Sequence, residues 1–246
     1  MRRFSWHILL AVLLIAVSAA IYAFQILSFR QSDDTFFYML QDFAFVPIQV
    51  LLVTVIVNAL LGSRERAALR KKLNMVIGAF FSEAGTHLLK ALSEFDTNAA
   101  DLGPAVALGV RWSRKDFLRA RTFLRDREYA VDCGGGDLKE LRIFLVNKRN
   151  FLLRLLENPN LLEHETFTEL LWAVTHLTEE LSLRTDVGAL PSSDYAHLAG
   201  DIKRAYGQLL TQWLEYVEHL KTEYPYLFSV VVRTNPFDPD ASPIVS

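Results

Sequence analysis

The chain has 246 residues, 51% of them hydrophobic, and its 28 Asp and Glu residues slightly outnumber its 26 Lys and Arg residues. The acidic excess lies after residue 72, so we do not expect nucleic acid as a partner, because nucleic-acid binders concentrate positive charge. The single cysteine, Cys133, excludes an internal disulfide bond and fits a reducing cytoplasm.

Two long apolar runs open the chain, over residues 8–24 and 43–61. The second run carries no charge and is about as long as a helix that crosses a ~30 Å hydrocarbon core. Basic residues precede the first run and follow the second, whereas the segment between them, 28–34, has few. The positive-inside rule therefore predicts an integral protein of a bacterial-type inner membrane with both termini in the cytoplasm.

The N-terminus also fits a second interpretation. Two arginines, an apolar core and the small residues at 18–20 resemble a cleavable signal peptide. The apolar run continues past Ala20, where a mature chain normally becomes polar, and this favours an uncleaved span. We therefore expect a two-span transmembrane helical hairpin over residues 1–62.

Polar residues at the two runs recur at helical spacing. Ser18 and Gln25 are seven residues apart, as are Asp42 and Gln49, so each pair shares one helix face. In an antiparallel hairpin the two pairs would match in depth, and polar contacts between membrane helices contribute about 0.6 kcal/mol each. We predict that these four side chains form a polar seam between the spans.

A basic segment follows the second apolar run. Each basic side chain could bind anionic lipid headgroups, with a gain of about 1 kcal/mol per charge near a bilayer surface. Alternatively, these residues could only fix the orientation of the span in the membrane. The lipid bilayer is therefore an expected partner. The basic residues of this segment are Arg64, Arg66, Arg70, Lys71 and Lys72.

Residues 63–236 are predicted to form a cytoplasmic domain of roughly five helices. Apolar residues recur every three or four positions from Leu69 to Phe95, and turn-forming segments separate the later helical stretches. Strand patterns are nearly absent, so the predicted fold class is all-α. The proline-containing segment 237–246 is expected to be a disordered tail. Further helices are expected over residues 113–129, 138–157, 167–184 and 193–224, with capping residues at Ser113, Asp137, Thr166 and either Ser193 or Asp194.

Charge is unevenly distributed over this domain. Residues 111–127 contain seven basic and two acidic residues, whereas residues 155–183 contain six glutamates and neither lysine nor arginine. Left apart, the two segments would each produce a strong field of one sign. We predict that they lie near each other, either within one chain or between chains.

Four histidines lie four residues from a carboxylate on predicted helices, a spacing that places both side chains on one helix face. In a bundle such pairs could converge on a metal, although neither Glu-x-x-His nor His-Glu-x-x-His occurs. Surface ion pairs would explain the same spacing without a metal. The candidate metal ligands are His87, His176, Glu180, His197, Asp201 and His219.

No motif names a reaction: nucleophile-elbow, kinase and β-lactamase signatures are absent, and we expect neither catalytic residues nor a cofactor. The leading hypothesis is a membrane-tethered helical interaction or signal-relay module without catalytic activity, acting as a homo-oligomer or with a protein partner. One alternative is a membrane-bound enzyme or metal-binding helical bundle. Another is a small oligomeric channel or a transporter accessory subunit.

Overall fold

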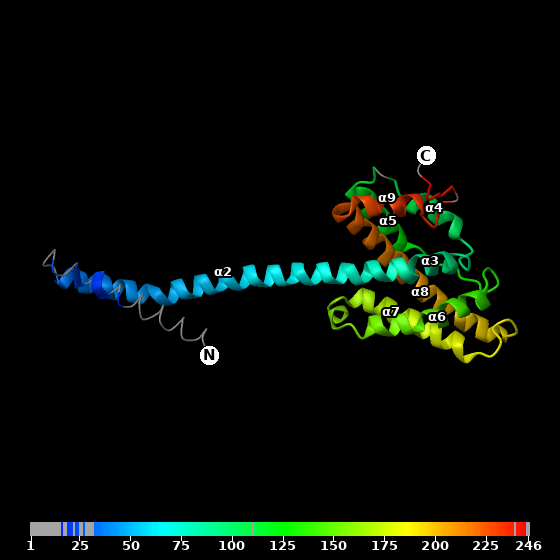
Figure 1. The fold of residues 1–246 in the computed structure, drawn as a ribbon, viewed down its shortest axis with the longest axis horizontal. Coiled ribbons are helices and arrows are strands. Elements are labelled where there is room, and N and C mark those ends of the chain that lie inside the picture. Colours follow the sequence, from blue (N-terminus) through cyan, green and yellow to red (C-terminus); the bar gives the residue numbers. More distant parts are fainter. Residues whose placement is uncertain are drawn as a thin grey trace. The chain divides into compact units, whose positions relative to one another are not determined.

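The computed structural model describes residues 32–109, 111–238 and 240–244, together with residues 16, 19–21, 23, 24 and 27. These residues form helices and no strand, which confirms the predicted all-α fold class (Figure 1). The chain divides into two units, Met1–Arg66 and Ala67–Ser246, which are described separately below. The predicted domain limits 1–62, 63–236 and 237–246 stay predictions.

The long helix α2, Ser32–Phe80, supplies most of the described part of the first unit and ends in the second. Among the described residues, no helix is both long enough and apolar enough to cross a membrane. The two-span hairpin is therefore unsupported, and the predicted integral membrane protein with cytoplasmic termini is wrong.

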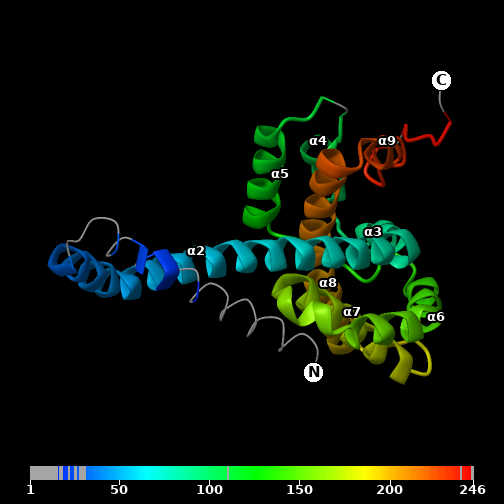
Figure 2. The ribbon, with the colours of Figure 1, turned by 60° about the vertical axis from the view of Figure 1, so that its left-hand side comes forward.

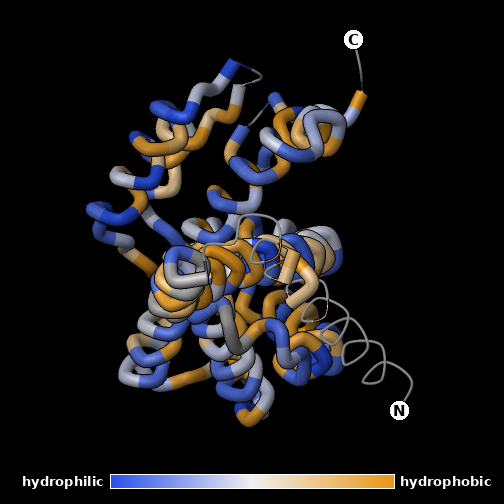
Figure 3. Tube along the Cα trace, turned by 90° about the vertical axis from the view of Figure 1, so that its left-hand side faces the viewer, coloured by the Kyte–Doolittle hydropathy of each residue, from blue (hydrophilic) through white to orange (hydrophobic). Residues whose placement is uncertain are grey.

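The second unit is a helical domain that begins with the last turns of α2. Apolar side chains that recur at helical spacing are buried, as Leu73, Ile77 and Phe80 are in α2. Hydrophobic and hydrophilic residues alternate along the helices (Figure 3). The elements that follow are the π-helix η1, Phe81–Gly85; α3, Thr86–Ser93; the 3-10 helix η2, Ala99–Asp101; α4, Leu102–Val106; α5, Arg114–Asp126; α6, Leu138–Leu156; the 3-10 helix η3, Pro159–Glu163; α7, Glu165–Leu183; α8, Ser192–Glu223; and α9, Pro225–Arg233.

The helix α8 organises this unit, because α3, α5, α7 and α9 all pack against it. Its first half lies beside α7, and its second half lies near α5 and α9 (Figure 2). Buried residues on several of its faces, including Tyr206 and Trp213, make these contacts. The predicted bundle thus has one central helix, and residues on α8 can meet residues from several neighbours.

A buried ion pair joins the loop after α3 to the segment after α5. Nη2 of Arg127 donates to Oδ2 of Asp96 over 2.8 Å, and the two side chains are 6% and 0% exposed. Arg127 also donates to the carbonyl of Asn98 and lies over the rings of Phe123 and Tyr129. Desolvation of both charges is costly, so the pair holds these segments together only while both partners are present.

The segment after α9 contacts the same domain. Nδ2 of the buried Asn235 donates to the carbonyl of Val106, and the ring of Phe237 lies edge-on to Trp213, with ring centroids 5.5 Å apart. The beginning of the segment expected to be disordered therefore packs on the domain in this structure.

Candidate metal centre

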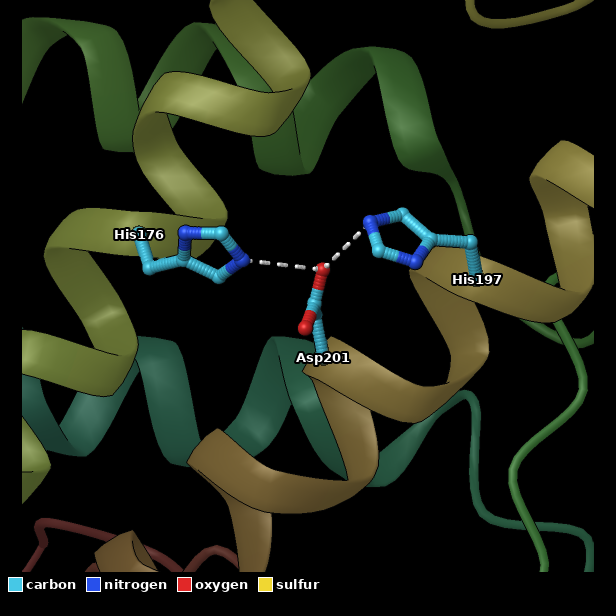
Figure 4. A group of neighbouring side chains, drawn as sticks. All are labelled: His176, His197 and Asp201. Atoms are coloured by element: carbon cyan, nitrogen blue, oxygen red, sulfur yellow. Dashed lines mark ion pairs between the residues drawn. The ribbon is translucent and has the colours of Figure 1, made fainter.

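Two histidines and an aspartate meet where α7 packs against the first half of α8. His176 comes from α7, and His197 and Asp201 come from α8, one turn apart (Figure 4). The two imidazoles point at the aspartate from opposite sides, with Nε2 of His176 3.5 Å and Nε2 of His197 3.4 Å from Oδ2. One donor atom from each of the three residues lies within 4.8 Å of the others.

The carboxylate at the centre is buried, whereas the histidines open to solvent. The side chain of Asp201 is 4% exposed, and those of His176 and His197 are 45% and 54% exposed. Oδ1 accepts a hydrogen bond from Arg204, but Oδ2 is buried and has no hydrogen-bond partner among the described residues. Both Nε2–Oδ2 distances are longer than an N–H···O hydrogen bond, which usually measures about 2.7–3.2 Å between nitrogen and oxygen. A buried carboxylate oxygen therefore faces two imidazole nitrogens without a normal hydrogen bond to either.

A second carboxylate lies beside the two histidines. Oε2 of Glu180 is 3.6 Å from Nε2 of His197, and Oε1 is 4.0 Å from Nε2 of His176. Nη1 of Arg184 donates to Oε2 over 2.7 Å, and this hydrogen bond lowers the pKa of Glu180 below its ordinary value. Glu180 is therefore an ionised carboxylate fixed at the edge of the cluster.

Arg184 also holds the two helices in position. Its Nε and Nη2 donate to both oxygens of Asp194 near the start of α8, over 2.8 and 2.6 Å. This two-point contact lowers the pKa of Asp194 and raises the pKa of Arg184. The end of α7 and the beginning of α8 are thereby joined directly beside the histidines.

Three of the separations between the donor atoms come close to those expected around one shared metal ion. Four ligands at ~2.0–2.1 Å around a tetrahedral zinc ion lie about 3.3 Å apart. The Nε2–Oδ2 distances of 3.4 and 3.5 Å, and the 3.6 Å from Glu180 to His197, come close to that value. Other separations are longer, 4.0 Å between Glu180 and His176 and up to 4.8 Å among the three donor atoms, so the side chains would have to close around an ion.

Of the six predicted metal ligands, the structure brings together four: His176, Glu180, His197 and Asp201. His87 lies elsewhere, with its ring against Phe144 and its centroid 4.3 Å away. Glu83, the carboxylate four residues before His87, forms an ion pair with Lys148 instead. Sequence reasoning missed Arg184, although it follows Glu180 by four residues and so shares its helix face.

His219 also lies apart from the cluster and has a different role. Its Nδ1 is 3.2 Å from Nδ2 of Asn74, where a neutral imidazole accepts from the amide. Burial lowers the pKa of His219 below its ordinary value of about 6.5, although Glu223 opposes this shift. As the pH falls below about 6.5, His219 binds a proton more readily in the unfolded chain than in the folded chain. The contribution of neutral His219 to stability is therefore present above about pH 6.5 and is lost as the pH falls.

We therefore expect the His219→Gln variant to lose less stability than the wild type between about pH 7.5 and about pH 5.5. Urea unfolding at the two pH values measures the difference, with the exposed His87→Gln as the matched control. An equal loss in the wild type and in the His219→Gln variant would show that His219 does not contribute to the acid sensitivity.

The other predicted site residues belong to α2 or precede it. Ser18 and Gln25 lie outside the described residues, and Asp42 and Gln49 are exposed on α2. The polar seam is thus untested and, without the hairpin, it has no support. The predicted lipid ligands Arg64, Arg66, Arg70, Lys71 and Lys72 are all exposed on the same helix, and their role is also untested.

The chain was compared with known proteins. Residues 69–233 match the family model described as "Uncharacterized protein MJ1433, C-terminal helical domain", and residues 2–61 match "MJ1433, N-terminal helical domain". The "Uncharacterized protein MJ1433" of Methanocaldococcus jannaschii is 43% identical over 233 residues, which cover 95% of this chain and 94% of that protein. No solved structure matches. The chain therefore belongs to the MJ1433 family.

Proposed function

We propose that the chain is a helical metal-binding protein that holds one zinc ion between α7 and α8. The observation that carries this proposal is the buried Oδ2 of Asp201, which has no hydrogen-bond partner among the described residues and faces Nε2 of His176 and of His197. A buried carboxylate oxygen without a hydrogen bond is costly even though the other oxygen pairs with Arg204, and a divalent cation would compensate it. Neutral imidazole and carboxylate are also common zinc ligands.

Glu180 completes the proposed site. Its carboxylate is ionised and lies 3.6 Å from His197, so a small side-chain movement would make it the fourth ligand. Arg184 would then orient this ligand from outside the coordination shell, as residues around metal ligands commonly do. A site with four protein ligands is typical of structural or regulatory zinc rather than of a catalytic ion with an open position.

Zinc would act here by joining two helices that the 184–191 loop connects. Because the ion would bind the folded pair of helices in preference to the unfolded chain, it would stabilise the fold by about 2.7 kcal/mol when free zinc is about 100 times Kd. This role replaces the membrane-bound alternatives predicted from the sequence. The hypothesis of a channel or transporter accessory subunit stays an untested prediction.

Isothermal titration of the chelator-treated full-length chain with zinc tests the proposal. We expect one ion per chain, release of protons on binding, and weaker binding in acid, because the imidazoles must be neutral. His197→Ala should abolish this binding, whereas His87→Ala, which removes an exposed histidine outside the cluster, should preserve it. Equal zinc binding by the wild type and by His197→Ala would refute the site.

A further inference from the structure

The first half of α7 presents an acidic surface that no described part of the chain covers. We call the exposed residues Glu165, Glu169 and Trp172 the acidic face. They recur at spacings of four and three, so they share one side of the helix. Trp172 is 60% exposed, which is unusual for so large an apolar side chain, and α7 contains neither lysine nor arginine.

The outer side of α5 has the opposite character. The exposed residues Lys115, Leu118 and Thr122 define what we call the basic face, with Arg114 and Arg125 at its margins, the latter beside the exposed Asp126 with which it pairs. Leu118 is 48% exposed at its centre. The helix is amphipathic in the usual sense, because Phe117, Ala120 and Leu124 are buried on its other side. The basic face thus combines positive charge with the exposed Leu118, and the acidic face combines negative charge with the exposed Trp172.

These two faces do not meet within one chain. α5 packs on α4 and on the second half of α8, and its Arg121 forms an ion pair with Glu218 of α8 over 2.5 Å. α7 packs on α6 and α8, and in both ribbon views α5 and α7 lie on opposite sides of α3 (Figures 1 and 2). The complementary charges of the two faces are therefore available to another molecule.

We infer that the basic face of one copy docks on the acidic face of a second copy, with Leu118 against Trp172. The charges are opposite and each face has one large exposed apolar residue, which is the composition of a small helix–helix interface. Because different faces meet, the contact is heterologous, so the first copy keeps its acidic face and the second keeps its basic face for further copies. The inference does not depend on the zinc site.

Mixed-cysteine cross-linking tests this contact. In a Cys133→Ser background, one full-length chain would carry Thr122→Cys on α5 and another Glu169→Cys on α7, both at exposed positions. Oxidation in the presence of a chelator should give a disulfide-linked dimer when the two variants are mixed, and far less when either is alone. Ile143→Cys, on an exposed position of α6, replaces Glu169→Cys in the control mixture and should give little product.

Charge reversal makes the test specific for the proposed pairing. With Leu118 against Trp172 and Thr122 near Glu169 the helices run antiparallel, which places Arg125 level with Glu165. Adding Arg125→Glu to the first chain, or Glu165→Lys to the second, should lower the cross-linked fraction several-fold, and combining both should restore part of it. Raising the salt concentration should also lower it, because the charges are exposed. No mixed product above the Ile143→Cys control, or a product insensitive to both charge reversals, would overturn the inference.

Discussion

Replacing Arg127 by methionine is expected to lower the free energy of unfolding by about 3–5 kcal/mol, because it leaves the carboxylate of Asp96 buried without its charged partner. That carboxylate is fully buried, and its other described hydrogen bond comes from the backbone N–H of Asn98. Methionine keeps much of the apolar length of arginine, so the loss would report the missing charge and hydrogen bonds rather than a cavity. Urea unfolding of the two proteins measures the change.

Arg125→Met is the matched control, since Arg125 pairs with Asp126 on the surface, where both side chains are more than half exposed. Its expected effect is about 0–1 kcal/mol. Adding Asp96→Asn to Arg127→Met should recover part of the loss, because the asparagine carries no charge. A loss below about 1 kcal/mol for Arg127→Met would contradict a buried ion pair at this position.

Replacing Asp201 by asparagine is expected to separate stability from metal binding. Without metal, the variant should be as stable as the wild type or more stable, by up to about 1–2 kcal/mol, because it removes a buried carboxylate oxygen that has no hydrogen-bond partner. Its affinity for zinc should fall by at least about 100-fold, more than the 10–100-fold loss typical of residues outside the coordination shell. Unfolding without metal and zinc titration measure the two effects.

The conservative control is Asp201→Glu, which keeps the charge and should retain part of the zinc affinity. Asp238→Asn, at an exposed position distant in sequence, should change neither quantity. If Asp201→Asn lost stability without metal and kept its zinc affinity, Asp201 would be a structural residue of the domain and not a ligand.

The helices of the second unit follow from local patterns. The expected helices at 113–129, 138–157, 167–184 and 193–224 correspond to α5 to α8 within a few residues at each end. Asp137 caps α6 by accepting hydrogen bonds from the backbone of Lys139 and Glu140, as its side-chain chemistry predicts. Helix α7 instead begins at Glu165, because His164, an uncommon capping residue, accepts from the backbone of Phe167.

The start of the chain shows where such patterns fail. A long apolar run is compatible with several environments, and the two runs alone do not establish a pair of membrane spans. Most of the first run lies outside the described residues, and the second lies within α2, one helix from Ser32 to Phe80. The apolar stripe after residue 69 predicts a packed helix, and the burial of Leu73, Ile77 and Phe80 confirms it.

The candidate site needed both sequence spacing and tertiary structure. The spacing of four predicted that His176 and Glu180 share one helix face, as do His197 and Asp201. It did not show that these two pairs face each other while His87 and His219 lie elsewhere, because that depends on how α7 packs against α8. Burial of Asp201 likewise arises from packing, and the proposed metal site depends on it.

Titration of the chelator-treated full-length chain with Co²⁺, a spectroscopic substitute for zinc, tests the central claim most directly. Two imidazoles and two carboxylates around one ion should give the intense visible absorption of tetrahedral cobalt, saturating at one ion per chain and abolished by added zinc. Asp201→Asn should remove this absorption, and His87→Ala should not. The faint spectrum of hydrated cobalt throughout the titration, or an equally intense spectrum in Asp201→Asn, would contradict a metal centre at His176, His197 and Asp201.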